Sequence, residues 1–309
     1  MQFRQLRYFV KIVDAGSFSR AASIVHVAQP ALSQQIAELE GRLGVSLLQR
    51  SARGVRPTAA GEVLYEKASA ILRRLDRLPS LVQSSGSEPV GHVNLGIASS
   101  LAAKLVAGVV EECRANLPKV ALRVSDGDSL SLEQRTSSAA LELAIVYEDG
   151  LTARLTRMPL FRQKLFLICS EPLSDNPSAI SLERLAGLPL VLPAPGNGRR
   201  DILDRMFADA KLPLKLALEA DSLGTELSAV QNKVGYTVLP VGDMSHFGPH
   251  AFAKPVPIDP PICLTCSIVQ SGDLPLTRAA EAVRDCLIKF IERRVGEIDM
   301  PGLEWIASD

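Results

Sequence analysis

QPALSQQIAELE, residues 29–40, combines an early proline with large apolar side chains at helical spacing. Proline suits the first turn of a helix, because its missing N–H is not needed there. The large apolar side chains follow i, i+4, i+7 and i+11, so they form one narrow stripe. We therefore predict a helix that begins at Gln29–Pro30 and turns this stripe toward a core. The stripe comprises Leu32, Ile36, Leu39 and Leu43.

The opposite face of this predicted helix has no bulky side chain. A slim face can enter the major groove of DNA, where Gln can form paired hydrogen bonds to an adenine edge and Ser can bond a base or a phosphate. The helix N-terminus itself attracts phosphate. In an isolated helix the same residues are more typical of an ordinary solvent-exposed face. The neighbouring sequence therefore has to distinguish a DNA-binding face from a merely solvated one. They are Pro30, Gln34, Ala37 and Gly41, with Ser33 on the flank and Gln29 at the leading end.

The preceding residues supply two shorter helices. Phe3, Leu6 and Phe9 begin an amphipathic run that stops at Ala15–Gly16. Ser17 is a typical N-cap, and a second short helix follows it to about His26. Two short helices, a tight turn and a third helix with a slim face indicate a helix-turn-helix.

The segment LLQRSARGVRPTAAG, residues 47–61, follows the third helix and is typical of a wing. It combines apolar residues, three arginines and a Gly-Val turn before another helix start. Arg53 is best placed to reach a minor groove or phosphates, with Arg50 and Arg56 as supports.

Positive charge is concentrated near the N-terminus, although the whole chain of 309 residues is neutral. Residues 1–58 hold eight Lys or Arg and three Asp or Glu, a net charge of +5. Residues 59–90 have equal numbers of basic and acidic side chains, so residues 91–309 carry a net charge of −5. This asymmetry favours a basic nucleic-acid-binding module joined to an acidic body with another task.

A long helix is predicted after Thr58, which can cap it. Its apolar residues alternate at spacings of four and three, a pattern that a partner helix can cover. Packing on the chain's own body is the alternative. Pro79 predicts that the helix ends or kinks near Leu78, and the Ser-, Gly- and Pro-containing residues 84–91 suggest a hinge. The expected seam comprises Leu64, Ala68, Ile71, Leu75 and Leu78.

The stretch FRQLRYFVKIVDAGSFSRAASIVHVAQPALSQQIAELEGRLGVSLLQRSARGVRPTAAG, residues 3–61, resembles the LysR-type transcriptional regulators in the order and spacing of its motifs. The resemblance implies a winged helix-turn-helix that binds double-stranded DNA as a homodimer or homotetramer and responds to a small effector. It implies that Gln29, Pro30, Ser33 and Gln34 read bases, that Arg53 contacts DNA, and that the long helix pairs two subunits. Altered recruitment of RNA polymerase would follow from effector binding.

From His92 onward, predicted strands and helices alternate, which favours an α/β body with a largely parallel sheet. The family resemblance implies a periplasmic-binding-protein-like effector domain of two α/β subdomains. The expected domains are 1–58 for DNA binding, 59–90 for the linker helix and hinge, and 91–309 for the effector domain. Within the last, the expected subdomains are 91–160 with 267–309, and 161–266.

Ligands of such sheets bind at the carboxyl ends of strands, where helix N-termini favour anions. We therefore expect a small carboxylate as effector. Ordinary helix capping is the alternative for each of the residues concerned. The expected effector-binding residues are Ser99, Ser100, Asp128, Tyr147, Asn197 and Thr225, with Asp126 nearby.

LELAIVYEDG, residues 141–150, and the tail around Trp305 look like the nitrogen-assimilation-control branch of the family. Members commonly carry a second glycine shortly before the position of Tyr236, where this chain has Lys233. We expect the preceding helix to end differently for that reason.

The alternative function is a ligand-binding protein or enzyme of solute-binding fold without a regulatory role. The sequence contains no H-E-x-x-H, G-x-S-x-G or G-x-x-x-x-G-K motif, and the basic N-terminal module argues against a ligand-binding protein alone. We expect no catalytic residue, cofactor or metal site. No apolar run is long enough to span a bilayer, so we expect no membrane partner and a cytoplasmic protein.

Five scattered cysteines argue for a reducing compartment rather than a disulfide framework. Cys263 and Cys266 are three apart on a predicted strand and so point to opposite faces. We interpret both as buried apolar side chains, with a redox role as the alternative.

Overall fold

The computed structural model describes residues 1–51, 54–83, 88–148, 155–195, 197–241, 251–295 and 302–306. By its contacts the chain divides into two compact units, Met1–Gln83 and Ser84–Asp309. Two predicted features, Arg53 in the wing and the hinge residues 84–87, lie outside the described residues.

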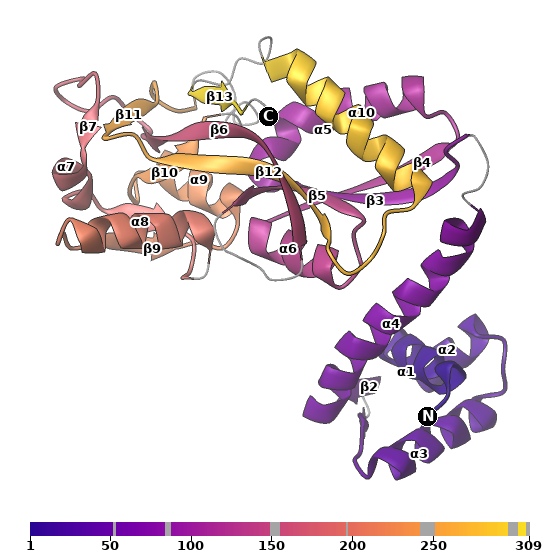
Figure 1. The fold of residues 1–309 in the computed structure, drawn as a ribbon. Coiled ribbons are helices and arrows are strands. Elements are labelled where there is room, and N and C mark those ends of the chain that lie inside the picture. The colour runs from indigo at the N-terminus through magenta and orange to yellow at the C-terminus, as the bar shows by residue number, and fades with distance from the viewer. Residues whose placement is uncertain are drawn as a thin grey trace. The chain divides into compact units, whose positions relative to one another are not determined.

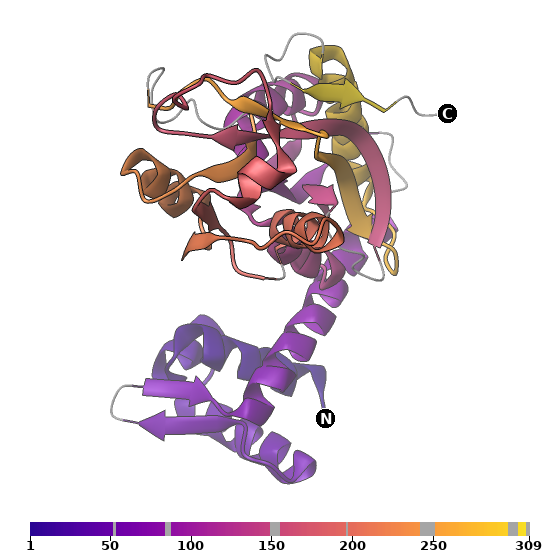
Figure 2. The same cartoon turned by 90° about the vertical axis from the view of Figure 1, so that its left-hand side faces the viewer.

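In the first unit, short helices and a hairpin precede one long helix (Figure 1). The hairpin is drawn as the two purple arrows in Figure 2. In chain order the elements are α1 (Phe3–Ala15), α2 (Phe18–Ile24), α3 (Gln29–Leu43), β1 (Leu48–Ser51), β2 (Gly54–Pro57) and α4 (Ala59–Gln83).

The boundaries of the first helices have local causes. Gly16 ends α1 in the left-handed conformation, with φ of 61°, which glycine adopts without a steric penalty. Ser17 then caps α2, because its Oγ accepts a hydrogen bond from the backbone N–H of Arg20 at 3.4 Å. Pro30 lies in the first turn of α3. The three helix starts and the end of α1 agree with the sequence prediction.

The apolar stripe of α3 packs into the core of the first unit, except at its last residue. Leu32, Ile36 and Leu39 are at most 2% exposed and belong to the same cluster as Phe9 of α1. Leu43 is 42% exposed, so the prediction that it faces the core was wrong. The helix ends at Leu43, and only its earlier turns are covered.

The predicted wing is an antiparallel hairpin in which Leu48 pairs with Pro57 and Ser51 with Gly54. Gly54 has a φ of 116°, and a Cβ there would lie 2.7 Å from the carbonyl oxygen of Gly16. The position therefore requires glycine. The backbone N–H of Val55 donates to the Gly16 oxygen at 3.0 Å, which joins the wing to the end of α1.

Helix α4 begins at the predicted cap, since Thr58 Oγ1 accepts a hydrogen bond from the N–H of Gly61 at 3.0 Å. It then continues through Pro79 to Gln83. The helix therefore does not end near Leu78, whereas a kink there, the other predicted effect of the proline, stays a prediction. Proline removes one backbone donor, but its φ is compatible with a helix, and the remaining backbone continues the helical turn.

The predicted seam of α4 is divided between two faces of the helix. Ala68 is 1% exposed and lies in the core of its own unit, and Leu64 and Leu75 pack against that core. Ile71 is 41% exposed and Leu78 is 50% exposed. Assigning Ala68 to a dimer seam was therefore wrong, because α4 packs that face against α1.

The second unit is an α/β body with mixed sheets (Figure 1). Its first elements are β3 (Gly91–Ala98), α5 (Ser99–Asn116), β4 (Val120–Gly127), α6 (Ser129–Ser137), β5 (Leu143–Glu148), β6 (Leu155–Ile168), β7 (Ile180–Ser181), α7 (Leu182–Ala186) and β8 (Leu190–Leu192). The chain continues with α8 (Gly198–Asp209), β9 (Leu216–Glu219), α9 (Leu223–Gln231), β10 (Thr237–Pro240), β11 (Val256–Asp259), β12 (Cys263–Ser271), α10 (Arg278–Val295) and β13 (Leu303–Trp305).

The main sheet runs in the order β4-β3-β5-β12-β6-β11-β7, with β10 and β13 also paired to β6. Strands β3, β4 and β5 are parallel, as alternation with helices predicts. The expectation of a largely parallel sheet was otherwise wrong, because β12 is antiparallel to both β5 and β6. Helices α5 and α10 pack beside each other and contact β3 (Figure 1).

Strands β6 and β12 are the long central pair of the body. Cys266 pairs with Phe161, and the register shifts between Cys266 and Ser267. The boundaries between the two expected subdomains, near Leu160 and Cys266, thus lie close together on these strands.

The two cysteines of β12 differ in exposure. Cys266 is fully buried, and burial raises the pKa of its thiol well above the ordinary value. Cys263 is exposed, so the interpretation of both as buried was wrong for Cys263. It is the first residue of β12, and burial is more complete further along the strand.

Two searches of the described residues gave negative results. None of their helices is both long and apolar enough to cross a bilayer. Their His, Cys, Asp and Glu side chains do not gather into a group of three or more that could hold a metal ion.

Candidate functional site

The first candidate surface is the exposed face of α3. Gln29, Pro30 and Gln34 are exposed and Ser33 is half-buried. The Nε2 of Gln29 donates to Ser33 Oγ at 3.4 Å, one turn further along the helix. The small residues expected beside them, Ala37 and Gly41, are exposed as well. The face opposite the buried stripe is therefore slim and carries hydrogen-bonding groups.

Glu38 orders the amide side chains around this face. Its Oε1 accepts a hydrogen bond from Gln34 Nε2 at 3.3 Å, and its Oε2 accepts from Gln35 Nε2 at 3.1 Å. Gln5 of α1 also donates to Oε2, at 3.5 Å. Sequence reasoning missed this carboxylate, although its spacing of four residues from Gln34 is typical of a helical pair.

Glu40 joins α3 to the wing. Its Oε1 accepts hydrogen bonds from the backbone N–H of Leu47 at 2.7 Å and of Leu48 at 3.2 Å. The start of β1 is therefore held against the recognition-type helix, although both belong to different motifs in the sequence. This positioning contact was also not predicted.

The arginines of the wing have different surroundings. The guanidinium of Arg50 lies over the ring of Phe18, 4.2 Å from its centroid, which is a cation–π contact. Arg56 is exposed and pairs through its backbone with Gln49. Arg50 is therefore partly held by the protein, whereas Arg56 extends from an exposed position of the hairpin.

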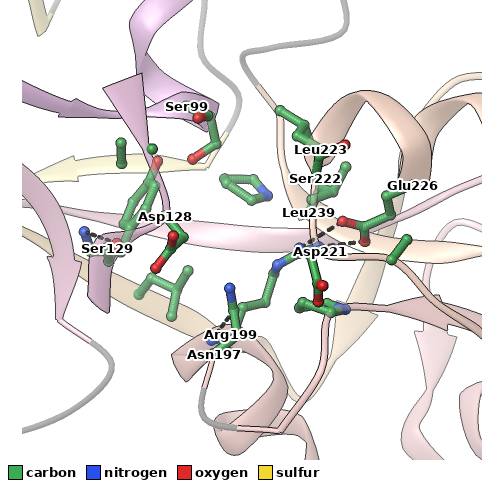
Figure 3. Close-up of a pocket in the computed structure, with 18 residues that line it drawn as sticks. Ser99, Asp128, Ser129, Asn197, Arg199, Asp221, Ser222, Leu223, Glu226 and Leu239 are labelled. Carbon is green, nitrogen blue, oxygen red and sulfur yellow. Dashed lines mark hydrogen bonds and ion pairs between the residues drawn. The ribbon is translucent and has the colours of Figure 1, made fainter. Parts of the chain in front are cut away.

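The second candidate site is a pocket of about 270 Å³ in the second unit (Figure 3). One wall comes from the ends of β3, β4 and β5 and the starts of α5 and α6, and the other from the region of α8, α9 and β10. Both walls are therefore built from strand ends and helix starts, as expected for an α/β ligand site. The predicted residues that line it are Ser99, Ser100, Asp128, Tyr147 and Asn197.

Thr225 and Asp126 lie outside this lining. Thr225 was expected to close the pocket, but its hydroxyl and its backbone N–H both hydrogen-bond Ser222 Oγ, at 2.8 and 3.2 Å. Ser222 is the N-cap of α9 and lines the pocket in its place. Asp126 accepts a hydrogen bond from Ser99 Oγ at 3.2 Å, so it acts behind a lining residue.

The wall formed by α8 and α9 contains a buried ion pair that the sequence did not reveal. Arg199 Nη1 and Nη2 donate to the two carboxylate oxygens of Glu226 at 2.7 and 2.8 Å. The two side chains are 13% and 1% exposed. Arg199 Nη1 also donates to the carbonyl oxygen of Val238 at 2.9 Å, and Thr237 donates its hydroxyl to Glu226. This network fixes α8, α9 and β10 to one another.

Tyr147 lines the pocket from the end of β5. Its hydroxyl donates to Gln163 Oε1, and Gln163 Nε2 donates to the carbonyl oxygen of Val241 at 3.1 Å. The backbone N–H of Tyr147 donates to Ser129 Oγ at 3.1 Å. The buried Gln163 on β6 therefore connects β5 with the end of β10, and no motif in the sequence indicated it.

Comparisons with known proteins give consistent matches over nearly the whole chain. Residues 3–62 match the family described as "Bacterial regulatory helix-turn-helix protein, lysR family". Residues 86–291 match the "LysR substrate binding domain". The two matches correspond to the two units of the structure.

Among curated relatives, the nitrogen assimilation regulatory protein nac of Escherichia coli (strain K12) is 36% identical over 242 residues, which are 78% of each chain. The nac protein of Klebsiella aerogenes is 33% identical over 296 residues, which are 95% of this chain and 96% of that protein.

Two similar solved structures are full-length regulators. A full-length OxyR variant from Pseudomonas aeruginosa has a TM-score of 0.69 at 22% identity, covering 100% of this chain and 99% of that one. Full-length CbnR complexed with its target DNA has a TM-score of 0.66 at 18% identity, covering 95% and 99%. At these identities the likeness concerns the fold.

Proposed function

The chain belongs to the LysR family of DNA-binding transcriptional regulators and resembles its nitrogen-assimilation-control members, and we propose that it reads its operator with the exposed face of α3. The observation that carries this proposal is the division of α3 into two faces. Leu32 and Ile36 are buried on one, while Gln29 and Gln34 are exposed on the other. The alternative of a solute-binding protein without a regulatory role leaves residues 3–62 unexplained.

In this proposal, the start of α3 enters the major groove with Gln29, Pro30, Ser33 and Gln34. The wing contacts the adjacent DNA strand. Gln34 turns its amide from Glu38 to an adenine edge, for which it can supply a donor and an acceptor. Arg56 contacts phosphate or the minor groove, as do Arg50 and Arg53. Phosphate contacts hold the protein on DNA, and the amide contacts select the sequence.

We propose that α4 brings two copies together through its exposed apolar residues. Val63, Ile71 and Leu78 are 62%, 41% and 50% exposed and recur at eight- and seven-residue intervals along α4, so they lie on one side of the helix. The predicted seam thus loses the buried Ala68 and gains Val63, while the half-buried Leu64 and Leu75 stay in it. A two-fold pair would present two α3 helices to successive major grooves about 34 Å apart.

The domain assignment follows the same division of labour. We propose that residues 1–58 bind DNA, 59–90 form the dimerisation helix and hinge, and 91–309 respond to an effector. Within the last, 91–160 with 267–309 and 161–266 form two subdomains around the pocket. An effector that binds one arrangement of these parts more tightly shifts the balance between them, and altered contact with RNA polymerase follows.

The effector proposed from the sequence is a small carboxylate, bound by Ser99, Ser100, Asp128, Tyr147 and Asn197. The start of α5 supports this proposal, because Ala98 makes no side-chain capping bond there and a ligand carboxylate could accept from the free backbone N–H groups. The pocket also contains acidic side chains. These side chains would repel a ligand that carries only negative charge.

The test of operator reading is Gln34→Ala. On its own operator, identified from DNA bound in cells, the variant should lose about 1–3 kcal/mol of binding free energy with little change on a scrambled duplex. Fluorescence anisotropy at fixed salt measures both. Gln35→Ala is the matched control, because Gln35 is half-buried and bonds the same Glu38. An equal loss on both duplexes would remove Gln34 from base reading.

A further inference from the structure

The pocket of the second unit has an unbalanced charge. Its charged lining residues are Asp128, Arg199, Asp221 and Glu226. Figure 3 shows Asp128 on the α6 side, and Asp221 beside the start of α9 with Arg199 and Glu226 nearby. One guanidinium therefore shares the pocket with three carboxylates.

The guanidinium is not available to a ligand. Glu226 binds it in a two-pronged arrangement at 2.7 and 2.8 Å, and Glu226 itself is 1% exposed. A ligand carboxylate that captured Arg199 would leave Glu226 buried without its cation, which is strongly unfavourable. The pair is therefore neutral toward the pocket, and Asp128 and Asp221 leave a net charge of about −2.

The two remaining carboxylates keep free acceptor capacity. Asp128 caps α6 through Oδ1, which accepts the N–H of Ser131 at 2.8 Å, so Oδ2 can still accept. Asp221 is exposed, and within the described part of the chain its carboxylate takes part in no hydrogen bond or ion pair. Such groups attract a cation that can donate several hydrogen bonds, which a protonated amine does.

The start of α5 gives the pocket a region of opposite preference. This helix runs for 18 residues, its N-cap makes no side-chain capping bond, and Ser99 and Ser100 of its first turn line the pocket. Backbone N–H groups at such a helix start favour a carboxylate, and the hydroxyl of Ser100 can donate to it as well. The hydroxyl of Ser99 already donates to Asp126. The pocket thus combines an anion-binding end with an acidic remainder.

We propose that the effector is a small zwitterion of the amino-acid class, with its protonated amine held by Asp128 and Asp221 and its carboxylate at the start of α5. This inference rests on the proposed effector function and adds a required positive charge to the carboxylate. A volume of about 270 Å³ lies just below the range of typical ligand pockets, about 300–1,000 Å³, which suits a molecule of this size.

The experiment is a thermal-shift and calorimetric titration of the full chain with the standard L-amino acids. Succinate and 1,4-diaminobutane serve as ligands that carry only one kind of charge. At least one amino acid should raise Tm in a concentration-dependent manner, whereas succinate and the diamine should not. Asp221→Asn and Asp128→Asn should each weaken binding of that amino acid at least about tenfold. Asparagine is also a good N-cap, so Asp128→Asn keeps the start of α6.

Asp209→Asn is the control, because Asp209 is an exposed carboxylate at the end of α8 and lies outside the lining. The affinity of this variant for the amino acid should equal that of the unchanged chain. Binding of succinate but of no amino acid would refute the zwitterionic effector and would support a simple carboxylate effector. Binding of the diamine alone would overturn the anion-binding end. Absence of any amino-acid response would also overturn the inference, while selective operator binding would still be decided by Gln34→Ala.

Discussion

The amide of Gln34 is already engaged before any DNA is present, because it donates to Glu38 at 3.3 Å. Glu38 also binds Gln35 and Gln5, so its position is fixed from two helices. A base that recruits Gln34 must replace one hydrogen bond to a carboxylate, and Glu38 repels phosphates that approach too closely.

The wing offers a test of the phosphate contacts. Arg56→Ala should weaken binding to all duplexes and reduce the salt dependence of log K by about one unit, because each neutralised phosphate releases condensed counterions. Titrations at several salt concentrations measure this slope. Arg205→Ala, at an exposed position of α8, is the control and should leave it unchanged. A slope unaffected by Arg56→Ala would contradict a phosphate contact at that residue.

Lys233 illustrates what one substitution in a family pattern does. It follows the end of α9 with a φ of 60°, a left-handed conformation that costs a non-glycine residue about 1–2 kcal/mol. Its backbone N–H donates to the oxygen of Val230 at 3.0 Å. We expected a different helix end here, but the turn is the left-handed kind that glycine forms, and the lysine adopts it with strain.

Lys233→Gly should therefore raise the free energy of unfolding by up to about 1 kcal/mol, since relief of strain exceeds the added flexibility of the unfolded chain. The exposed ion pair of Lys233 with Glu171, 2.5 Å between Nζ and Oε1, is worth little. Lys233→Ala is the control that loses the pair and keeps the strain. Urea denaturation measures both, and a glycine variant less stable than the alanine variant would refute the explanation.

At the scale of elements, α4 shows the limit of periodicity. Spacing predicted the helix, but it has apolar residues on two adjacent faces, and only the packed structure distinguishes them. Tyr65 donates to Asp14 at 2.5 Å and Arg7 pairs with Asp76 at 3.0 Å. These contacts join α4 to α1, the helix against which Ala68 is buried. Neither contact is visible from the heptad pattern, since their residues lie more than fifty positions apart.

The corrected seam predicts a defined effect on assembly. Ile71→Glu should raise the dimer dissociation constant at least about tenfold, because covering an isoleucine side chain is worth about 1.5–3 kcal/mol. Circular dichroism should remain unchanged, since Ile71 is 41% exposed in the single chain. Sedimentation equilibrium measures the association. Glu66→Lys, a charge change at an exposed position of α4, is the control and should leave the dimer intact. An unaltered dimer in Ile71→Glu would exclude the exposed apolar residues of α4 as the dimer contact.

At the scale of the whole molecule, local sequence patterns predicted most of the helices and strands. They did not predict which distant strands pair. The alternation after His92 correctly indicated the parallel strands β3, β4 and β5. The antiparallel pair β6 and β12 joins segments about a hundred residues apart, and no local signal states which strands will meet. The short strands β7, β11 and β13 were missed for the same reason.

The pocket shows the same limit. Helix starts after strands are visible in a sequence, so Ser99, Ser100 and Asn197 could be selected. The partnership of Arg199 with Glu226 could not, because it depends on how α8 packs against α9. Because that pair neutralises Arg199, the pocket keeps a net negative charge. The ligand that we propose therefore carries a positive charge as well as the carboxylate expected from the sequence.

The central claim, that the slim face of α3 selects a DNA sequence, is tested most directly by repeated selection of bound duplexes from a random pool with the full chain. The account predicts enrichment of an inverted repeat whose half-sites lie about one helical turn, or a multiple of it, apart. Gln34→Ala should enrich a motif that has lost its preference at one position of each half-site. Binding without enrichment of any sequence, or an identical motif for Gln34→Ala, would contradict it.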